Sequence, residues 1–340
     1  MGGSHAASPT TPSPVGTFSL RKASFEEDPV KLTPVELENC KAALAVLQER
    51  LRVHDGVEHE YSALQAETIT SSLLIDTEVM QCARDPANSK KNRYLDVLPF
   101  DDNRVLLQPE SSNGEASDYI NASYVYDSDR PDLPKYIATQ GPLPATTEDF
   151  WAMVIQQRCQ AIISLTREVE RDRPKCAHYF PEAAGQAERY GHIVVATREV
   201  TYLQQGLIAR RMIEVASTAS ASPPLVLPHY HYLDWPDHGV PASTSVIRGL
   251  LRHLRLSLPP SSPPIVIHCS AGIGRSGTFL TVDYTVRRAL SGDLSAMDIA
   301  ETVKKLRALR GGMVQTRDQY RFCYIAVREE LEDLVAWGSG

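Results

Sequence analysis

The residues that could do chemistry gather in one short segment in the last third of the chain. Cys269 is followed six residues later by Arg275, and two glycines lie between them. The apolar run 265–267 predicts a buried strand before the cysteine, and residues from Ser276 to about Ala289 predict a helix after it. In a tight loop of this kind, successive backbone N–H groups can converge on an anion at a helix N-terminus. The segment therefore predicts a phosphate cradle in which the guanidinium binds two oxygens.

Cys269 is the predicted nucleophile of this cradle. The loop amides, the helix dipole and Arg275 all favour a negative sulfur, so the thiol pKa should fall well below its free value of about 8.5. The resulting thiolate can attack at neutral pH. A buried structural cysteine would leave the Cys-x5-Arg spacing unexplained, and the nucleotide-binding pattern G-x4-G-K-[ST] does not occur in the sequence.

The segment 268–277 (HCSAGIGRSG) resembles the signature of the classical protein tyrosine phosphatases. Other segments resemble further motifs in the family's order: KNRY at 91–94, DYINA at 118–122, IATQGP at 137–142, WPDHGVP at 235–241 and QTRDQ at 315–319. The resemblance extends from about Lys91 to Ala336 and is greatest to the plant single-domain cytoplasmic members. It implies hydrolysis of phosphotyrosine in proteins through a phosphocysteine on Cys269, with neither a cofactor nor a metal.

Asp237 is the predicted general acid. Donating a proton to the leaving tyrosine oxygen as the P–O bond breaks lowers the barrier, and the same carboxylate would then activate the hydrolytic water. The neighbours Trp235, Pro236 and Gly239 suit a loop that closes over substrate. An aspartate in an ordinary Pro-Asp turn is the alternative, which the cradle and the family resemblance outweigh.

The resemblance assigns roles to further residues of the site. Gln315 and Gln319 would position the water, and Ser276 would stabilise the leaving thiolate, although a plain helix N-cap would also explain a serine there. His268 would hydrogen-bond the backbone near Cys269 and tune the thiolate rather than donate a proton. The phosphate would be bound by Arg275 and by the loop residues Ser270, Ala271, Gly272, Ile273 and Gly274.

Tyr94 and Asp96 are the residues that the resemblance assigns to substrate binding. Tyr94 would stack on the substrate ring and deepen the pocket, so that phosphotyrosine reaches the nucleophile while phosphoserine falls short. Asp96 would accept a hydrogen bond from the substrate backbone. Glu170 is expected to hold Arg275 in place, and Lys175 is expected to contact the loop that carries the acid.

The elements that must position these residues form one α/β domain. A capping box at Thr33-Pro34-Val35-Glu36 predicts the start of a first helix. We predict a central twisted mixed sheet flanked by helices, with residues 33–340 as the catalytic domain and the Ser/Thr/Pro-rich residues 1–32 as a disordered arm. The expected strands are 160–166, 191–202, 207–216, 225–233 and 265–267, of which 191–202, 207–216 and 225–233 are expected to be successive antiparallel strands. The expected later helices are 58–80, 295–309 and 318–335, with a loop at 256–264.

Composition excludes several classes of function. A formal net charge of −7 argues against sequence-independent nucleic-acid binding. The sequence has no apolar run of membrane-spanning length, and its start lacks the basic-then-apolar arrangement of a secretory signal peptide. Its six cysteines lack C-x-x-C spacing, as is typical of reduced thiols. We therefore expect a monomer in the cytoplasm, or also in the nucleus, that binds neither nucleic acid nor membrane. The family resemblance suggests phosphotyrosine on signalling proteins such as MAP kinases as substrate.

Other functions explain fewer of the residues and motifs named above. A dual-specificity or phosphoinositide phosphatase using the same loop is the second choice, but the uncharged loop and Tyr94 favour phosphotyrosine. An inactive phosphotyrosine-binding module would not need Cys269, Arg275 and Asp237 together, and a structural scaffold would leave all the motifs unexplained. An exposed thiolate of low pKa would also be oxidised reversibly by peroxide.

Two further segments suggest other roles. His229 and His231 alternate on a predicted strand and share a face, as two metal ligands would, but the sequence offers no third ligand at matching spacing. Two histidines on a half-buried strand are therefore the preferred interpretation. The segment from Arg21 to Phe25 could be a kinase target at Ser24, although a solvated charge run explains it as well.

Overall fold

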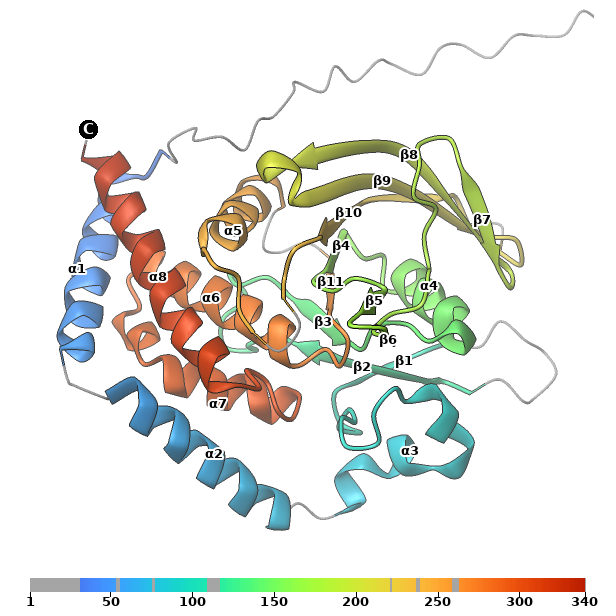
Figure 1. Cartoon of the computed structure of the whole chain (residues 1–340), viewed down its shortest axis with the longest axis horizontal. Coiled ribbons are helices and arrows are strands. Elements are labelled where there is room, and N and C mark those ends of the chain that lie inside the picture. The colour runs from blue at the N-terminus through green and yellow to red at the C-terminus, as the bar shows by residue number, and fades with distance from the viewer. Residues whose placement is uncertain are drawn as a thin grey trace, which may run out of the picture.

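A mixed β-sheet runs through the centre of the molecule, with helices packed on its two faces (Figure 1). The computed structural model describes residues 31–52, 56–74, 77–108, 117–220, 222–236, 239–258 and 263–339. Asp237, the predicted acid, lies outside the described residues, as does the predicted arm up to residue 30 with its Arg21–Phe25 segment. Among the described helices, none is both long enough and apolar enough to cross a membrane.

The sheet has nine strands in the order β1-β2-β3-β11-β4-β10-β9-β8-β7. Its strands are β1 (Arg104–Leu106), β2 (Tyr119–Val125), β3 (Tyr136–Thr139), β4 (Ala161–Ser164), β7 (Ala187–Tyr190), β8 (Ile193–Leu203), β9 (Ile208–Ser217), β10 (Leu225–Tyr232) and β11 (Ile265–His268). The four central strands β3, β11, β4 and β10 are parallel, and the outer pairs are antiparallel. A separate hairpin joins β5 (Val169–Glu170) to β6 (Arg173–Pro174).

The strand types follow from their sequences. Every residue of β4 and β11 is buried, as expected for apolar strands in a parallel sheet that is covered on both faces. In contrast, buried and more exposed residues alternate along the first half of β8. This is the pattern of an antiparallel strand with one face toward the core and the other toward solvent. The predicted antiparallel run of three strands, β8 to β10, is therefore confirmed.

Helices cover both faces of the sheet. They are α1 (Pro34–Leu51), α2 (Gly56–Leu74), α3 (Gln81–Arg84), α4 (Thr147–Gln156), α5 (Ser245–Ser257), α6 (Gly274–Leu290), α7 (Ile299–Leu309) and α8 (Arg317–Gly338), with short 3₁₀ segments at Thr77–Met80, Pro86–Lys91, Pro144–Thr146, Gln204–Gly206 and Leu294–Met297. The larger core lies between one face and α1, α5, α6, α7 and α8, and α4 packs on the other face. The capping box is present, since Glu36 accepts from the Thr33 amide at 2.8 Å and the Thr33 hydroxyl accepts from the Glu36 amide at 3.2 Å.

Some predicted boundaries were wrong. The helix expected over 58–80 is α2, which begins at Gly56 and ends at Leu74. The helix expected from 295 begins at Ile299, because the Asp298 carboxylate caps it by accepting from the Glu301 amide at 3.0 Å. The expected loop at 256–264 starts too early, since α5 continues to Ser257.

Candidate functional site

The predicted phosphate loop connects the end of β11 to the start of α6. Because β11 lies among parallel strands, the loop sits at their carboxyl ends, where ligands bind in open α/β sheets. The flanking backbone fixes the ends of the loop: the Leu165 amide donates to the His268 carbonyl at 2.9 Å, and the Gly141 amide donates to the Ser270 carbonyl at 2.9 Å.

Gly272 allows the loop to turn. Its φ of +73° lies in the left-handed region, and a Cβ at this position would lie 2.1 Å from the carbonyl oxygen of Thr139. Arg310, which is fully buried, donates to the carbonyl oxygens of Ala271 and Gly272, at 3.1 Å in each case. These carbonyls are thereby held away from the nucleophile, and the Gly272 amide instead donates to Cys269 Sγ at 3.2 Å. The loop is thus arranged as a set of donors around the sulfur.

Cys269 lies at the base of this loop, with 4% of its surface exposed. Burial alone would raise the pKa of its thiol. The Ser276 hydroxyl, the positive charge of Arg275 and the amides of Ser276 and Gly272 outweigh burial and hold the pKa of Cys269 below its ordinary value. The predicted thiolate is therefore supported by its surroundings.

Arg275 is held beside the loop by three acceptors. Its Nη1 donates to Glu170 Oε1 at 2.6 Å and to the Leu165 carbonyl at 2.9 Å, and its Nη2 donates to Glu170 Oε2 at 2.7 Å. Glu170 belongs to the β5–β6 hairpin, so this small hairpin positions the guanidinium. The predicted contact between Glu170 and Arg275 is confirmed.

Ser276 lies inside α6 rather than at its cap. The helix begins at Gly274, and its N-cap residue is Ile273, which makes no side-chain capping bond, so the N-cap explanation of Ser276 was wrong. The buried Ser276 hydroxyl makes no hydrogen bond to an oxygen or nitrogen of the described residues. Its proton can therefore turn toward the sulfur of Cys269, in agreement with its effect on the thiol pKa.

Gln315 and Gln319 lie against the loop at Gly274. A Cβ on Gly274 would lie 3.0 Å from Gln319 Nε2 and 3.2 Å from Gln315 Oε1. The backbone around them is fixed, since Gln319 Oε1 accepts from the Gln315 amide at 2.9 Å and the Tyr61 hydroxyl donates to the Gln315 carbonyl at 2.7 Å. Both side-chain amides therefore lie beside the phosphate loop where it enters α6.

Tyr94 forms a wall of the site. Its hydroxyl lies 2.9 Å from Ser270 Oγ, which itself donates to the Lys175 carbonyl at 3.0 Å. The neighbouring Arg93 anchors the segment by donating from Nη2 to the Pro142 carbonyl at 2.7 Å. Asp96 is exposed, and together with Ile273 and Gln315 it lines a cavity of about 590 Å³.

Behind Cys269 lies a set of contacts that sequence reasoning missed. His268 Nδ1 lies 3.2 Å from the Cys269 carbonyl, as predicted, but its Nε2 lies 2.7 Å from the hydroxyl of Tyr179. The same hydroxyl lies 2.8 Å from Nε2 of His229. No local pattern marks Tyr179 or Arg310 as site residues, because their partners are distant in the sequence.

The residues on either side of the segment 237–238, which holds the predicted acid Asp237, belong to the part of the chain that the structure describes. Trp235 is buried, and its Nε1 donates to the Gly239 carbonyl at 3.1 Å, across the two undescribed residues 237 and 238. On the other side Arg167, which precedes the β5–β6 hairpin, pairs with Asp234 at 3.3 Å. The loop that carries the predicted acid is therefore tied to the hairpin that holds Arg275.

The histidines considered as metal ligands have protein partners instead. His231 Nε2 lies 2.8 Å from the Thr166 carbonyl, and His229 contacts Tyr179. Within the described part of the chain, one other group, Glu168 with His178 and Glu182, brings three potential ligand atoms within 4.8 Å of one another. His178 already pairs there with Glu168 at 2.7 Å, and the group is separate from Cys269.

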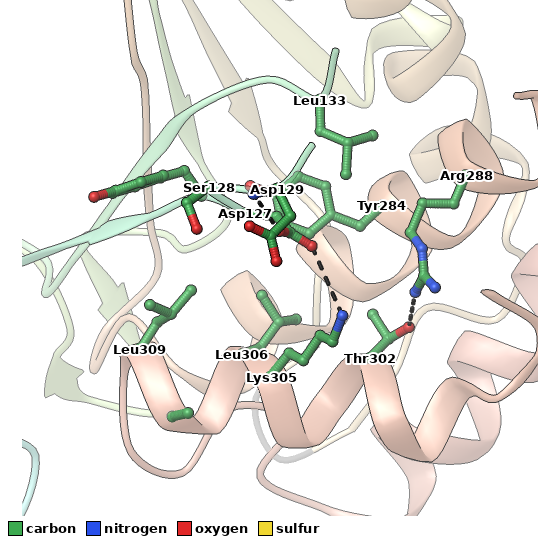
Figure 2. A pocket seen from close by; sticks show the side chains of 12 residues that line it. Asp127, Ser128, Asp129, Leu133, Tyr284, Arg288, Thr302, Lys305, Leu306 and Leu309 are labelled. Carbon is green, nitrogen blue, oxygen red and sulfur yellow. Dashed lines mark hydrogen bonds and ion pairs between the residues drawn. The ribbon is translucent and has the colours of Figure 1, made fainter. Parts of the chain in front are cut away.

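A further cavity of about 270 Å³ lies between α6, α7 and the segment that follows β2 (Figure 2). Figure 2 shows Lys305 reaching toward Asp127, and the two charged groups are 3.8 Å apart. The apolar side chains of Leu133 and Leu306 also line the cavity. Its lining contains none of the predicted site residues. This cavity is therefore distinct from the candidate active site.

Comparison with known proteins agrees with this geometry. Residues 88–329 match the family described as protein-tyrosine phosphatase. The chain is 43% identical over 321 residues to "Protein-tyrosine-phosphatase PTP1" of Arabidopsis thaliana, covering 94% of this chain and 92% of that protein. It is 36% identical over 295 residues to human "Tyrosine-protein phosphatase non-receptor type 20", covering 87% of this chain and 65% of that protein. The solved catalytic domain of human "Protein Tyrosine Phosphatase non-receptor Type 18" superposes with a TM-score of 0.74 at 33% identity, over 85% of this chain and 99% of that one.

Proposed function

This chain belongs to the protein-tyrosine phosphatase family, and we propose that it hydrolyses phosphotyrosine through a phosphocysteine formed on Cys269. The proposal rests mainly on one observation: the Gly272 amide, the Ser276 hydroxyl and the guanidinium of Arg275 all act on the sulfur of Cys269. The Gly272 amide donates to Cys269 Sγ at 3.2 Å, and Glu170 fixes Arg275 beside it. Together they favour both the thiolate and a bound dianion.

In the first step, the Cys269 thiolate attacks phosphorus, and the bond from phosphorus to the tyrosine oxygen breaks. Asp237, on the loop between Trp235 and Gly239, donates its proton to the leaving oxygen. Arg275 and the amides of the phosphate loop bind the oxygens of the transferred group, whose negative charge they balance.

In the second step, water attacks the phosphocysteine while Asp237 accepts its proton. The sulfur–phosphorus bond breaks, phosphate leaves and the thiolate is restored. Gln315 and Gln319 would orient this water, a role that the position of both side chains against Gly274 supports. Ser276 stabilises the returning thiolate by its hydroxyl.

Tyr94 supports phosphotyrosine rather than phosphoserine or a phosphoinositide as substrate. Its hydroxyl bonds Ser270, the residue after the nucleophile, which supports a pocket that the Tyr94 ring would deepen. Asp96 would bind the substrate backbone. On the family resemblance we extend the proposal to a catalytic domain over 33–340, acting as a monomer in the cytoplasm or nucleus on signalling proteins such as MAP kinases.

The test compares phosphate release from matched phosphotyrosine and phosphothreonine peptides, in reductant and EDTA, with Cys269→Ser as control. Release from the phosphotyrosine peptide alone, abolished in the variant, is the expected result. Equal release from both peptides would instead establish the dual-specificity alternative. No release from either by folded protein would leave a phosphotyrosine-binding module.

A further inference from the structure

Three buried side chains form a hydrogen-bonded row behind the nucleophile. His229 comes from β10, His268 from the end of β11, and Tyr179 from the segment after β6, and none is more than 1% exposed. The Tyr179 hydroxyl stands between the two imidazoles, 2.8 Å from His229 Nε2 and 2.7 Å from His268 Nε2. The row ends at the Cys269 carbonyl, 3.2 Å from His268 Nδ1.

The direction of these hydrogen bonds follows from counting protons. Burial holds the pKa of His229 well below its ordinary value and that of His268 at about 3, so each ring is neutral and carries one N–H. The Cys269 carbonyl can only accept, so the His268 proton is on Nδ1 and its Nε2 is an acceptor. Tyr179 therefore donates its single proton to His268.

His229 must then be the hydrogen-bond donor in its contact with Tyr179. Since the Tyr179 proton is already given to His268, the hydroxyl oxygen must accept from His229 Nε2–H. The His229 proton is then on Nε2, and Nδ1, which has no hydrogen-bond partner among the described residues, is bare. The opposite direction would place a buried, unpaired N–H at His229 and would turn the bare Nδ1 of His268 toward the Cys269 carbonyl.

We propose that His229 is a positioning residue for the nucleophile: by donating to Tyr179 it fixes the proton of His268 on the nitrogen that holds the Cys269 carbonyl. The inference rests on the proposed function of Cys269. Without the His229 donor, the Tyr179 hydroxyl can rotate, and His268 can place its proton on Nε2 instead. The Cys269 peptide then loses its donor, and the loop that stabilises the thiolate is less well fixed.

Other polar and titratable groups lie near the row. His231 Nε2 lies 2.8 Å from the Thr166 carbonyl, and the Ser164 hydroxyl donates to that carbonyl at 3.3 Å. Arg211 donates to the Glu182 carbonyl at 3.2 Å and lies over the Phe180 ring. The Ser164 hydroxyl also lowers the pKa of Tyr179 by hydrogen bonding, Cys176 and Glu168 raise that pKa by their charge, and the charge of Arg93 lowers the pKa of His268. None of these is a hydrogen-bond partner of the His229 or His268 rings.

The first test measures the pH dependence of Cys269 alkylation by iodoacetamide in the full chain. His229→Leu should raise the midpoint by about one pH unit, which corresponds to about tenfold slower alkylation at a pH below both midpoints. His229→Gln should restore most of the rate, because its amide offers an N–H near the position of Nε2. KM for a phosphotyrosine peptide should change little, while kcat at pH 6 falls.

Two comparisons separate this role from general damage to the core. Tyr179→Phe breaks the same row, so combining it with His229→Leu should add little to the loss, whereas independent packing effects would add. His253→Leu is a matched control, since His253 Nε2 lies 2.8 Å from the Tyr230 hydroxyl in a tyrosine–histidine pair away from the loop. This control should leave the alkylation midpoint unchanged.

A measurement on the unmodified protein covers the case in which the variants do not fold. Nitrogen-15 NMR of histidine-labelled protein should show His229 with its proton on Nε2 and His268 with its proton on Nδ1. A proton on Nδ1 of His229, or an unshifted midpoint in folded His229→Leu, would overturn the inference. If Cys269→Ser retained phosphatase activity, the proposed function would fail instead, so the two failures are distinguishable.

Discussion

Glu170 and Arg275 form a two-pronged ion pair in which each carboxylate oxygen accepts from a different guanidinium nitrogen, at 2.6 and 2.7 Å. Burial would raise the pKa of Glu170, but Arg275 and Thr166 outweigh it and hold that pKa below its usual value. The pair therefore fixes the orientation of Arg275, which we propose binds the transferred phosphate.

Replacing Glu170 by glutamine should therefore impair catalysis and stability together. The amide keeps the shape but loses the charge and one acceptor, and breaking a buried ion pair costs about 3–5 kcal/mol. We expect kcat/KM for a phosphotyrosine peptide to fall at least tenfold, measured alongside urea unfolding. Glu188→Gln, on β7, controls for the loss of a charge. Unchanged kcat/KM in the Glu170 variant would show that Arg275 is oriented without it.

Gly272→Ala should abolish activity because the loop cannot hold a Cβ there. The new atom would meet the Thr139 carbonyl at 2.1 Å in a backbone with φ of +73°. Gly185→Ala isolates the conformational cost, since Gly185 has φ of +84° but no atom within 4 Å of the place a Cβ would take. The control should cost about 1–2 kcal/mol of unfolding free energy and keep full activity. Equal losses in both variants would contradict the close approach at Gly272.

Thiol reactivity should be confined to one of the six cysteines. Burial raises the pKa of Cys40 to about 11 and those of Cys159 and Cys176 to about 12, and it also raises the pKa values of Cys82 and Cys323. Only the pKa of Cys269 is lowered. At pH 6.5, brief iodoacetamide treatment should label Cys269 alone by peptide mass spectrometry, and peroxide should inactivate the enzyme until thiol is added. Comparable labelling of Cys176 would contradict this ordering.

His178 should contribute stability that depends on pH. Burial lowers the pKa of His178, but the carboxylates of Glu168 and Glu188 outweigh it and raise the pKa above its usual value. A raised pKa means that the contribution is complete below the unfolded value of about 6.5 and is lost as pH rises through the folded value.

The difference in unfolding free energy between the natural chain and His178→Gln should therefore be larger at pH 5.5 than at pH 9. Its size should be about 1 kcal/mol or less, because the pair is partly exposed. Urea unfolding at the two pH values measures it, and in a Glu168→Gln background the difference should shrink. A difference that does not vary with pH would mean that the imidazole is uncharged in this contact.

The phosphate loop could be predicted from sequence because its chemistry is local. Cys269, Arg275 and the glycines between them lie within one strand–loop–helix unit, and the apolar residues of β11 indicate the strand. The antiparallel strands could be predicted for the same reason, since alternation of polar and apolar residues is read within a single strand.

Other parts of the site could not be predicted, because they depend on contacts between segments that are distant in the sequence. Arg310 meets Gly272 across 38 residues, and Tyr179 meets His268 across 89, so neither contact leaves a local pattern. Helix α5 was also missed, although its own sequence marks it. Its buried apolar residues recur at the spacing of one helix face, at Val246, Ile247, Leu250, Leu251 and Leu254, so this helix could have been predicted.

Arg310 beneath the phosphate loop is a buried cation whose hydrogen-bond acceptors are all neutral: the carbonyls of Ala271 and Gly272, Asn121 Oδ1 and Ser123 Oγ. Burial lowers its pKa to about 10, so it keeps its charge at neutral pH. The negative charge of the Cys269 thiolate already acts against this lowering, and a dianion bound in the loop would add further counter-charge. By mass action, inorganic phosphate should act as a folding ligand, adding about 2.7 kcal/mol at one hundred times its dissociation constant. On the proposed function, the same attraction would also slow the departure of the phosphate product from the loop.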